Sequence, residues 1–224
     1  MEGGGVTAII FDLDGTLVDS APDIRAAANK MLESEGQAPL DLPTVISFIG
    51  NGLPKLVERA MRARDLPMER HAELAARTLA FYDAESTART RPYPGLTEAL
   101  DSLRAGGFIL GICTNKPAAP ARDILAQLDL AQYFDTVIGG DTLPVKKPDP
   151  APLRAAFAAL GRDGLYVGDS EVDAETAERA QVPFLLFTEG YRKQPVEALP
   201  HLARFDHFEA LPGLVARALE RAAG

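Results

Sequence analysis

Short apolar runs recur along this chain, and several are followed by segments with helical spacing. The runs occupy residues 6–11, 108–114, 136–140, 165–169 and 182–187. Helical periodicity follows three of them, at residues 119–128, 150–160 and 173–180. Each run has the length of a buried strand, and strands that alternate with helices are typical of a parallel sheet covered on both faces. We therefore predict an α/β fold built on a parallel sheet.

One long segment interrupts this alternation. Residues 20–90 carry helical patterns at 24–34, 53–64 and 70–84, with hardly any strand signal. The simplest interpretation is a helical domain inserted after the first strand. We predict a core made of residues 1–18 and 92–224, and an inserted helical domain at residues 19–91.

The composition excludes several classes of function. The chain has 224 residues, of which 46% are hydrophobic and 25% are charged, which is ordinary for a globular protein. A formal net charge of -9 argues against nucleic acid as a partner, because phosphate backbones are bound by Lys and Arg. No apolar stretch approaches the roughly 20 residues of a membrane span. The single cysteine, Cys113, suits a reducing cytoplasm, so we expect a cytoplasmic protein that acts on a small molecule.

Charged and polar residues follow the predicted strands. Asp12 and Asp14 come directly after the first apolar run, two apart, so their side chains point the same way in extended chain. Two like charges at the edge of a core are costly unless something neutralises them. Ligands bind at the carboxyl ends of strands in open parallel sheets, so the two carboxylates indicate a binding site.

The other strand ends add a hydroxyl, an amide, a lysine and further carboxylates. Thr114 and Asn115 follow the second run, Lys146 and Lys147 follow the third, and the segment "GDSEVD" at 168–173 follows the fourth. Taken alone, that last segment also fits a helix start with Ser170 or Asp169 as N-cap. Carboxylate oxygens gathered in this way suit a hard divalent cation, and Mg²⁺ also keeps substrate phosphate oxygens as ligands. The strand ends therefore predict a magnesium site that binds a phosphorylated substrate.

The same segments carry a family resemblance. "DLDGTLVDS", "CTNK", "KKPDP" and "GDSEVD" resemble the four motifs of the haloacid dehalogenase-like (HAD) superfamily of phosphohydrolases, in order and spacing. The resemblance covers nearly the whole chain and implies a Rossmann-like core with a helical cap domain inserted after the first strand. Within the superfamily, residues 48–60, 91–100 and 139–153 resemble the phosphoglycolate phosphatase family.

The resemblance implies a role for each motif residue. Asp12 corresponds to the nucleophile that becomes an aspartyl phosphate, and Asp14 to the general acid and base. Thr114 and Asn115 correspond to the residues that bind phosphate oxygens. Lys147, which directly precedes the proline, corresponds to the lysine that neutralises the phosphate.

The implied Mg²⁺ ligands are Asp12, the carbonyl of Asp14, and Asp169. Asp173 corresponds to a residue that supports the metal waters or the lysine.

The resemblance implies a Mg²⁺-dependent phosphomonoesterase for a small phosphorylated acid, with 2-phosphoglycolate first. A phosphatase or mutase for another small phosphate such as a sugar phosphate, or a pyrophosphatase, is the alternative, and a non-catalytic HAD-fold binding protein is the remote one. Because helix N-termini attract carboxylates, we expect backbone amides of residues 50–53, with Gly50 and Asn51, to bind the substrate carboxylate, aided by Lys55 or Arg59. A monomer and a homodimer both stay open.

Overall fold

The computed structural model of the protein describes residues 7–85 and 87–223. Val6, the first residue of the first predicted strand, lies outside this part of the chain, as do residues 1–5 of the predicted core. Side chains are described as far as residue 218.

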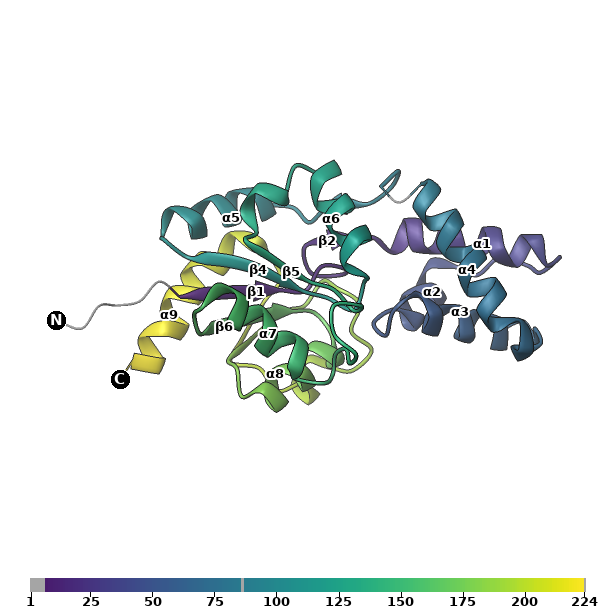
Figure 1. Cartoon of the computed structure of the whole chain (residues 1–224). Helices are drawn as coiled ribbons and strands as arrows, with labels where there is room; N and C mark the ends of the chain where they lie inside the picture. Colours follow the sequence, from purple (N-terminus) through teal and green to yellow (C-terminus); the bar gives the residue numbers. More distant parts are fainter. Residues whose placement is uncertain (1–6, 86, 224) are drawn as a thin grey trace.

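A parallel sheet forms the centre of the core, as predicted (Figure 1). Its strand order is β5-β4-β1-β6-β7-β8. The strands are β1 (Ala8–Phe11), β4 (Ile109–Cys113), β5 (Thr136–Ile138), β6 (Gly164–Gly168), β7 (Phe184–Phe187) and β8 (Ala203–Phe205). The first five coincide with the predicted apolar runs, whereas the short edge strand β8 has no such run.

The register of the sheet sets where the site forms. Phe11, at the end of β1, is paired with Ile112 on one side and with Val167 on the other. The residues that follow β1, β4 and β6 therefore leave the sheet at the same edge.

Helices cover both faces of the sheet. The helices of the core are α5 (Leu96–Ala105), α6 (Ala118–Gln127), α7 (Ala151–Leu160), α8 (Glu171–Ala180) and α9 (Leu211–Ala223). Ile9 and Phe11 of β1 pack into the apolar cluster that includes α5, α6 and α9, while Ala8 and Ile10 pack into the cluster that includes α7 and α8. Side chains alternate across a strand, so β1 is apolar on both sides. The three predicted core helices are confirmed; α5 and α9 were not predicted.

The described residues of the inserted segment form four α-helices beside the carboxyl ends of the strands (Figure 1). They are α1 (Ala21–Ser34), α2 (Leu42–Phe48), α3 (Leu53–Arg62) and α4 (His71–Ala84). The short strands β2 (Val18–Asp19) and β3 (Arg91–Pro92) pair antiparallel where the chain leaves and re-enters the core. We call residues 19–91 the cap. Short 3₁₀ helices occupy Met68–Arg70, Ala131–Tyr133, Val196–Ala198 and Phe208–Ala210.

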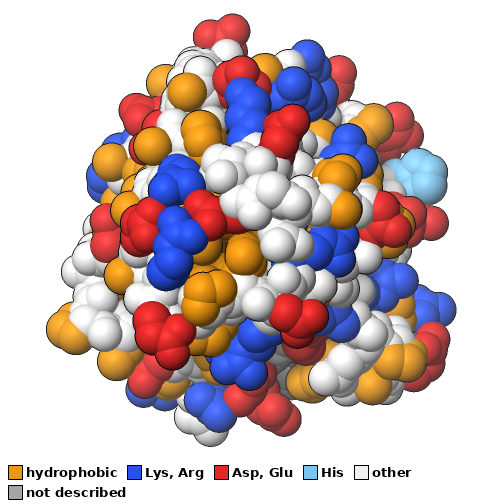
Figure 2. Space-filling model, turned by 90° about the vertical axis from the view of Figure 1, so that its right-hand side faces the viewer, with side chains coloured by type: hydrophobic (Ala, Val, Ile, Leu, Met, Phe, Trp, Pro, Cys, Tyr) orange, Lys and Arg blue, Asp and Glu red, His pale blue; other side chains and the backbone are white. Residues whose placement is uncertain are grey.

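Acidic and basic side chains are interspersed over the cap end of the molecule (Figure 2). Glu35 pairs with both Arg70 and Arg77, and Glu58 pairs with both Lys55 and Arg62. The cap cations therefore largely neutralise neighbouring acids on their own surface. Among the described helices, none combines the length and the apolar character that crossing a membrane requires.

Candidate active site

The site lies where the strands point at the cap. Asp12 follows β1, Thr114 follows β4 and Asp169 follows β6. Ligand atoms of Asp12, Asp169 and Asp173 all lie within 4.8 Å of one another. The strand ends thus bring together carboxylates that are far apart in the sequence.

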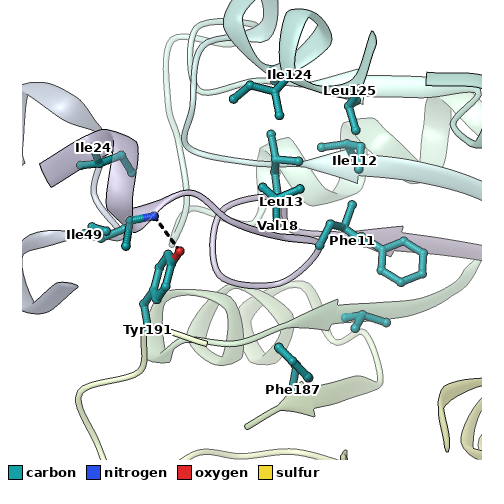
Figure 3. Close-up of a cluster of buried hydrophobic side chains, with 14 of the residues drawn as sticks. Phe11, Leu13, Val18, Ile24, Ile49, Ile112, Ile124, Leu125, Phe187 and Tyr191 are labelled. Carbon is teal, nitrogen blue, oxygen red and sulfur yellow. Dashed lines mark hydrogen bonds between the residues drawn. The ribbon is translucent and has the colours of Figure 1, made fainter. Parts of the chain in front are cut away.

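The turn after β1 places its alternate residues on opposite sides. Leu13 is fully buried in the cluster with Ile112 and Ile124, and in Figure 3 it points toward them. Gly15 has a φ of +88°, and a Cβ there would lie 2.6 Å from Asp169 Oδ2. Only glycine fits this turn, because it tolerates the positive φ and lets the backbone reach the carboxylate.

Two hydrogen bonds orient the carboxylate of Asp169. Thr16 Oγ1 donates to Oδ1 at 2.7 Å, and the backbone amide of Tyr191 donates to Oδ2 at 2.6 Å. Burial, followed by the neighbouring charges of Asp173 and Asp12, raises the pKa of Asp169 well above its usual value. None of the ion pairs among the described residues involves Asp169, so its carboxylate suits a role as a metal ligand.

Asp173 is saturated with hydrogen bonds. Its Oδ1 accepts from Lys147 Nζ and from the Tyr166 hydroxyl, each at 2.7 Å. Its Oδ2 accepts from Ser170 Oγ at 2.6 Å, from Ser170 N at 3.1 Å and from Asp169 N at 3.3 Å. Burial opposes the charge of Asp173, but Lys147 and these hydrogen bonds outweigh it and lower the pKa. With both oxygens engaged, Asp173 orients its neighbours.

The segment "GDSEVD" therefore both begins a helix and supplies carboxylates to the site. Ser170 is the N-cap of α8, and Ser170 with Asp173 forms a reciprocal capping box. The helix start holds Asp173 in place, and Asp173 in turn contacts Lys147.

Lys147 joins the nucleophile candidate to this network. Its Nζ lies 3.0 Å from Asp12 Oδ1 and donates to the Tyr166 hydroxyl at 2.8 Å. Burial alone would lower the pKa of Lys147, but the charges of Asp12 and Asp173 raise it above its usual value. Lys147 is therefore a permanent cation beside Asp12.

Asp12 itself is only partly neutralised. Burial, opposed by the charge of Lys147 and reinforced by that of Asp173, raises the pKa of Asp12 to about 7. Its Oδ1, although near Lys147, accepts no hydrogen bond of good geometry from the described residues. The cluster thus holds three carboxylates, on Asp12, Asp169 and Asp173, against the one ammonium of Lys147. Oxygen ligands with surplus negative charge fit a hard divalent cation.

Asp14 has its own partners. Ser20 Oγ donates to Oδ1 at 2.6 Å, and Lys116 Nζ lies 3.0 Å from Oδ2. Lys116 belongs to the motif "CTNK", and its pKa is raised by Asp14 and Tyr82 although burial would lower it. Both oxygens of Asp14 are thus oriented, at a position separate from the Lys147 network.

The two polar residues after β4 have different surroundings. The hydroxyl of Thr114 accepts from the amide of Lys116 at 3.3 Å, and Thr114 lines the cavity between core and cap. Asn115 Nδ2 donates to the carbonyls of Gly50, at 2.9 Å, and of Lys147, at 3.0 Å. Asn115 therefore ties a loop of the cap to a loop of the core.

The loop at residues 49–52, which we call the cap loop, is bound to the core through its carbonyls. Lys193 Nζ donates to the carbonyl of Ile49 at 2.6 Å, and Lys146 Nζ donates to that of Asn51 at 3.5 Å. The side chain of Asn51 accepts from Arg59 at 2.9 Å, within the cap. Gly50 and Gly52 line the cavity, whereas Asn51 is not among its lining residues.

The cavity has one polar wall and one largely apolar wall. The core side presents Asp12, Asp14, Thr114, Asn115 and Lys116. The cap side presents Ile24, Leu53, Leu56, Leu79 and Tyr82. The polar groups of the cavity thus come mainly from the core, and most of its apolar side chains come from the cap.

Several residues that the structure places here had no predicted role. Ser20 and Lys116 lie inside the quoted motifs "DLDGTLVDS" and "CTNK", so their positions could have been noticed. Tyr82, Tyr166 and Tyr191 stand in no motif, and only their contacts show that they belong to the site.

Known proteins similar to this chain belong to one family of hydrolases. Residues 9–187 match the model of the family described as haloacid dehalogenase-like hydrolase. A phosphoglycolate phosphatase of Cereibacter sphaeroides is 53% identical over 214 residues, which is 94% of this chain and 98% of that protein. One from Rhodobacter capsulatus is 46% identical over 93% of this chain and 96% of its own length.

A solved structure with a similar fold carries the same kind of name as these relatives. The crystal structure of a predicted phosphoglycolate phosphatase from Haemophilus somnus is 30% identical, with a TM-score of 0.87. The match covers 93% of this chain and 97% of that one.

Proposed function

This chain belongs to the haloacid dehalogenase-like hydrolases, and from that premise we propose that it hydrolyses 2-phosphoglycolate to glycolate and phosphate with the help of Mg²⁺. The observation that carries the proposal is the buried contact of Asp12 with Lys147 beside Asp169, with Asp12 lining a cavity between core and cap. The choice of substrate is supported by the phosphoglycolate phosphatase of C. sphaeroides, 53% identical over 94% of this chain.

In this proposal Asp12 is the nucleophile. Its carboxylate attacks phosphorus, the bond to the alkoxide oxygen breaks, and an aspartyl phosphate forms. Lys147, held 3.0 Å from Asp12, neutralises charge on the transferred group, and the hydroxyl of Thr114 donates to one of its oxygens. Asn115, which bridges Gly50 and Lys147, shapes this phosphate site from its side.

Asp14 is the proposed general acid and base. It gives a proton to the departing glycolate oxygen and then takes one from the water that hydrolyses the aspartyl phosphate. Ser20 and Lys116 hold its two oxygens, which keeps the carboxyl group in one orientation through both steps.

The residues present fit Mg²⁺. Asp12, Asp169 and the carbonyl of Asp14 would bind it, and the surplus of carboxylates over ammonium groups in the cluster matches a divalent charge. When bound, Mg²⁺ withdraws charge from the phosphoryl group. Asp173, whose oxygens are all engaged, is proposed to position Lys147 and the start of α8.

The compartment is proposed as well, while monomer and homodimer remain alternatives. We infer the cytoplasm, where a free, buried thiol such as that of Cys113 stays reduced. A monomer and a homodimer are distinguished by light scattering during gel filtration.

Phosphate release from a panel of esters tests the function. With Mg²⁺, we expect the highest kcat/KM for 2-phosphoglycolate, lower values for sugar phosphates and pyrophosphate, and no turnover with EDTA. A sugar phosphate or pyrophosphate ranking first would replace the proposed substrate. No turnover of any ester would leave a non-catalytic binding protein.

A further inference from the structure

One pair of side chains brings core and cap into contact at the cavity wall. Lys116 comes from the core after β4, and Tyr82 comes from α4 of the cap. The Lys116 ammonium lies 4.7 Å from the centre of the Tyr82 ring and 3.0 Å from Asp14 Oδ2. Both residues line the cavity, and Tyr82 is only 4% exposed.

The hydroxyl of Tyr82 has no hydrogen-bond partner among the described residues. A buried hydroxyl without a partner lowers stability, so such groups are rare unless a ligand or water completes them. The apolar neighbours of Tyr82 on the cavity wall, Ile24, Leu56 and Leu79, offer no polar group. Lys116, the cation beside the Tyr82 ring, can only donate, so the hydroxyl proton of Tyr82 stays free to donate to a bound substrate.

The two cap cations expected to aid carboxylate binding, Lys55 and Arg59, are engaged elsewhere. Lys55 pairs with Glu58, and Arg59 donates to the carbonyl of Phe48 and to Asn51 Oδ1. Neither is among the residues that line the cavity. Lys116, from the core, is thus the cation best placed for an anionic group beyond the phosphate.

The chemistry of the substrate fixes where its carboxylate must be bound. In 2-phosphoglycolate a single methylene separates the carboxylate from the oxygen that leaves phosphorus. A group that binds the carboxylate must therefore lie next to the acid that protonates that oxygen. Lys116 meets this condition through its contact with Asp14, and its ammonium carries three donors, so the contact leaves further ones available.

We propose that the Lys116 ammonium and the Tyr82 hydroxyl together bind the substrate carboxylate and so select small phosphorylated acids. This inference rests on the proposed function. It also makes the cap a part of substrate recognition, since Tyr82 reaches the carboxylate only when the cap lies against the core.

Two matched inhibitors isolate this contact from the chemical step. 3-Phosphonopropionate replaces the ester oxygen of 2-phosphoglycolate by a methylene, and propylphosphonate also replaces the carboxylate by a methyl group. Inhibition constants of both are measured against hydrolysis of p-nitrophenyl phosphate. We expect wild-type protein to bind 3-phosphonopropionate at least about tenfold more tightly than propylphosphonate, because a hydrogen bond to a charged group contributes about that much. We call this ratio of inhibition constants the carboxylate preference.

Tyr82→Phe is the decisive variant, because it removes only the hydroxyl and keeps the ring under Lys116. We expect Tyr82→Phe to weaken the binding of 3-phosphonopropionate about tenfold and to leave the binding of propylphosphonate unchanged. Lys116→Met should abolish the remaining preference for 3-phosphonopropionate over propylphosphonate. Lys146→Met is the matched control, since Lys146 is an exposed lysine beside the cap loop that does not line the cavity; its preference should equal that of wild type.

Retention of the preference in both Tyr82→Phe and Lys116→Met would overturn the inference and favour the amides of residues 50–53. A loss in Lys146→Met as large as in Lys116→Met would also overturn it, because net charge alone would then explain the effect. Hydrolysis of 2-phosphoglycolate by wild-type protein is scored separately. Its absence would refute the proposed function, whereas the inhibitor ratios test the carboxylate contact.

Discussion

At the scale of single residues, Asp12 and Asp14 have different surroundings although only one residue separates them. Asp12 is buried against Lys147 with one oxygen lacking a hydrogen bond, whereas Asp14 is oriented by Ser20 and Lys116. These surroundings suit a nucleophile that must move toward phosphorus and an acid that must keep one orientation.

We predict that Asp12→Asn abolishes turnover of every ester and keeps the fold. The amide cannot form an acyl phosphate, and it has nearly the shape of the carboxylate. Phosphate release and circular dichroism check this, and mass spectrometry of acid-quenched wild-type protein should find the phosphoryl group on Asp12. Turnover by Asp12→Asn above background would remove covalent catalysis by this residue.

Asp14→Asn should show a dependence on the leaving group. Turnover of 2-phosphoglycolate should fall by roughly 10²–10⁴-fold, as expected for loss of a general acid. The loss in the rate of phosphoryl transfer to Asp12 should be smaller for p-nitrophenyl phosphate, which needs little protonation. Rapid-quench measurement of that first step makes the comparison. Equal losses for both esters would assign Asp14 another role.

At the scale of elements, the start of α8 supports both the fold and the site. Asp173 belongs to the capping box and neutralises Lys147, while Asp169 is held by Thr16 and the amide of Tyr191. Asp173 therefore supports the helix start and Lys147, whereas Asp169 is held in place by its neighbours as a proposed metal ligand.

We predict opposite rankings for Asp169→Ala and Asp173→Ala in two measurements. Asp169→Ala should raise the Mg²⁺ concentration for half-maximal activity more, because it removes a proposed ligand, while loss of a supporting residue costs about 10–100-fold. Asp173→Ala should lower the melting temperature more, because breaking a buried ion pair costs about 3–5 kcal/mol. The same ranking in both measurements would mean that the two roles are wrongly divided.

The cap loop offers a second test at this scale. Lys193 Nζ donates to the carbonyl of Ile49, so Lys193→Met should weaken the closed arrangement of cap and core. We expect KM for 2-phosphoglycolate to rise about threefold to tenfold, less than a buried bond to a charged group would give, because Lys193 is partly exposed. Lys30→Met, which breaks only an exposed pair with Glu85, is the control. Equal KM values for the two variants would contradict a role for this contact.

At the scale of the whole molecule, the carboxylate cluster and the cap are connected through Tyr191. Its backbone amide donates to Asp169, and its hydroxyl donates to Asp19 and accepts from the amide of Ala21. Figure 3 shows the hydroxyl reaching the base of the cap beside Ile24 and Ile49. Neutralising the carboxylate cluster should therefore stabilise the molecule beyond the site itself.

We predict that Mg²⁺ raises the melting temperature of the protein. At a free concentration one hundred times its dissociation constant, binding adds about 2.7 kcal/mol of stability. For a chain of this size that corresponds to a shift of roughly 5–10 °C. Calorimetry with and without Mg²⁺ measures the shift, and Asp169→Ala should show little of it. An equal shift in Asp169→Ala would place the metal elsewhere.

The amino-acid sequence alone determined the sheet and the residues at its edge. Apolar runs of strand length must be buried, and parallel strands bring their carboxyl ends to one edge whatever the details of packing. Asp12, Thr114, Lys147 and Asp169 could therefore be placed together from their positions after the runs. The edge strand β8 escaped because its residues are few and Arg204 faces solvent, which leaves no run to recognise.

The tertiary structure alone decided what the cap contributes. Tyr82, Lys193 and Tyr191 have no local signal, since each acquires its role from a partner far away in the sequence. Local sequence encodes periodicity and turn chemistry, but the approach of cap and core depends on contacts between residues far apart in the sequence. That is why the carboxylates at the strand ends could be read from the chain, while the side chains that meet across the cavity could not.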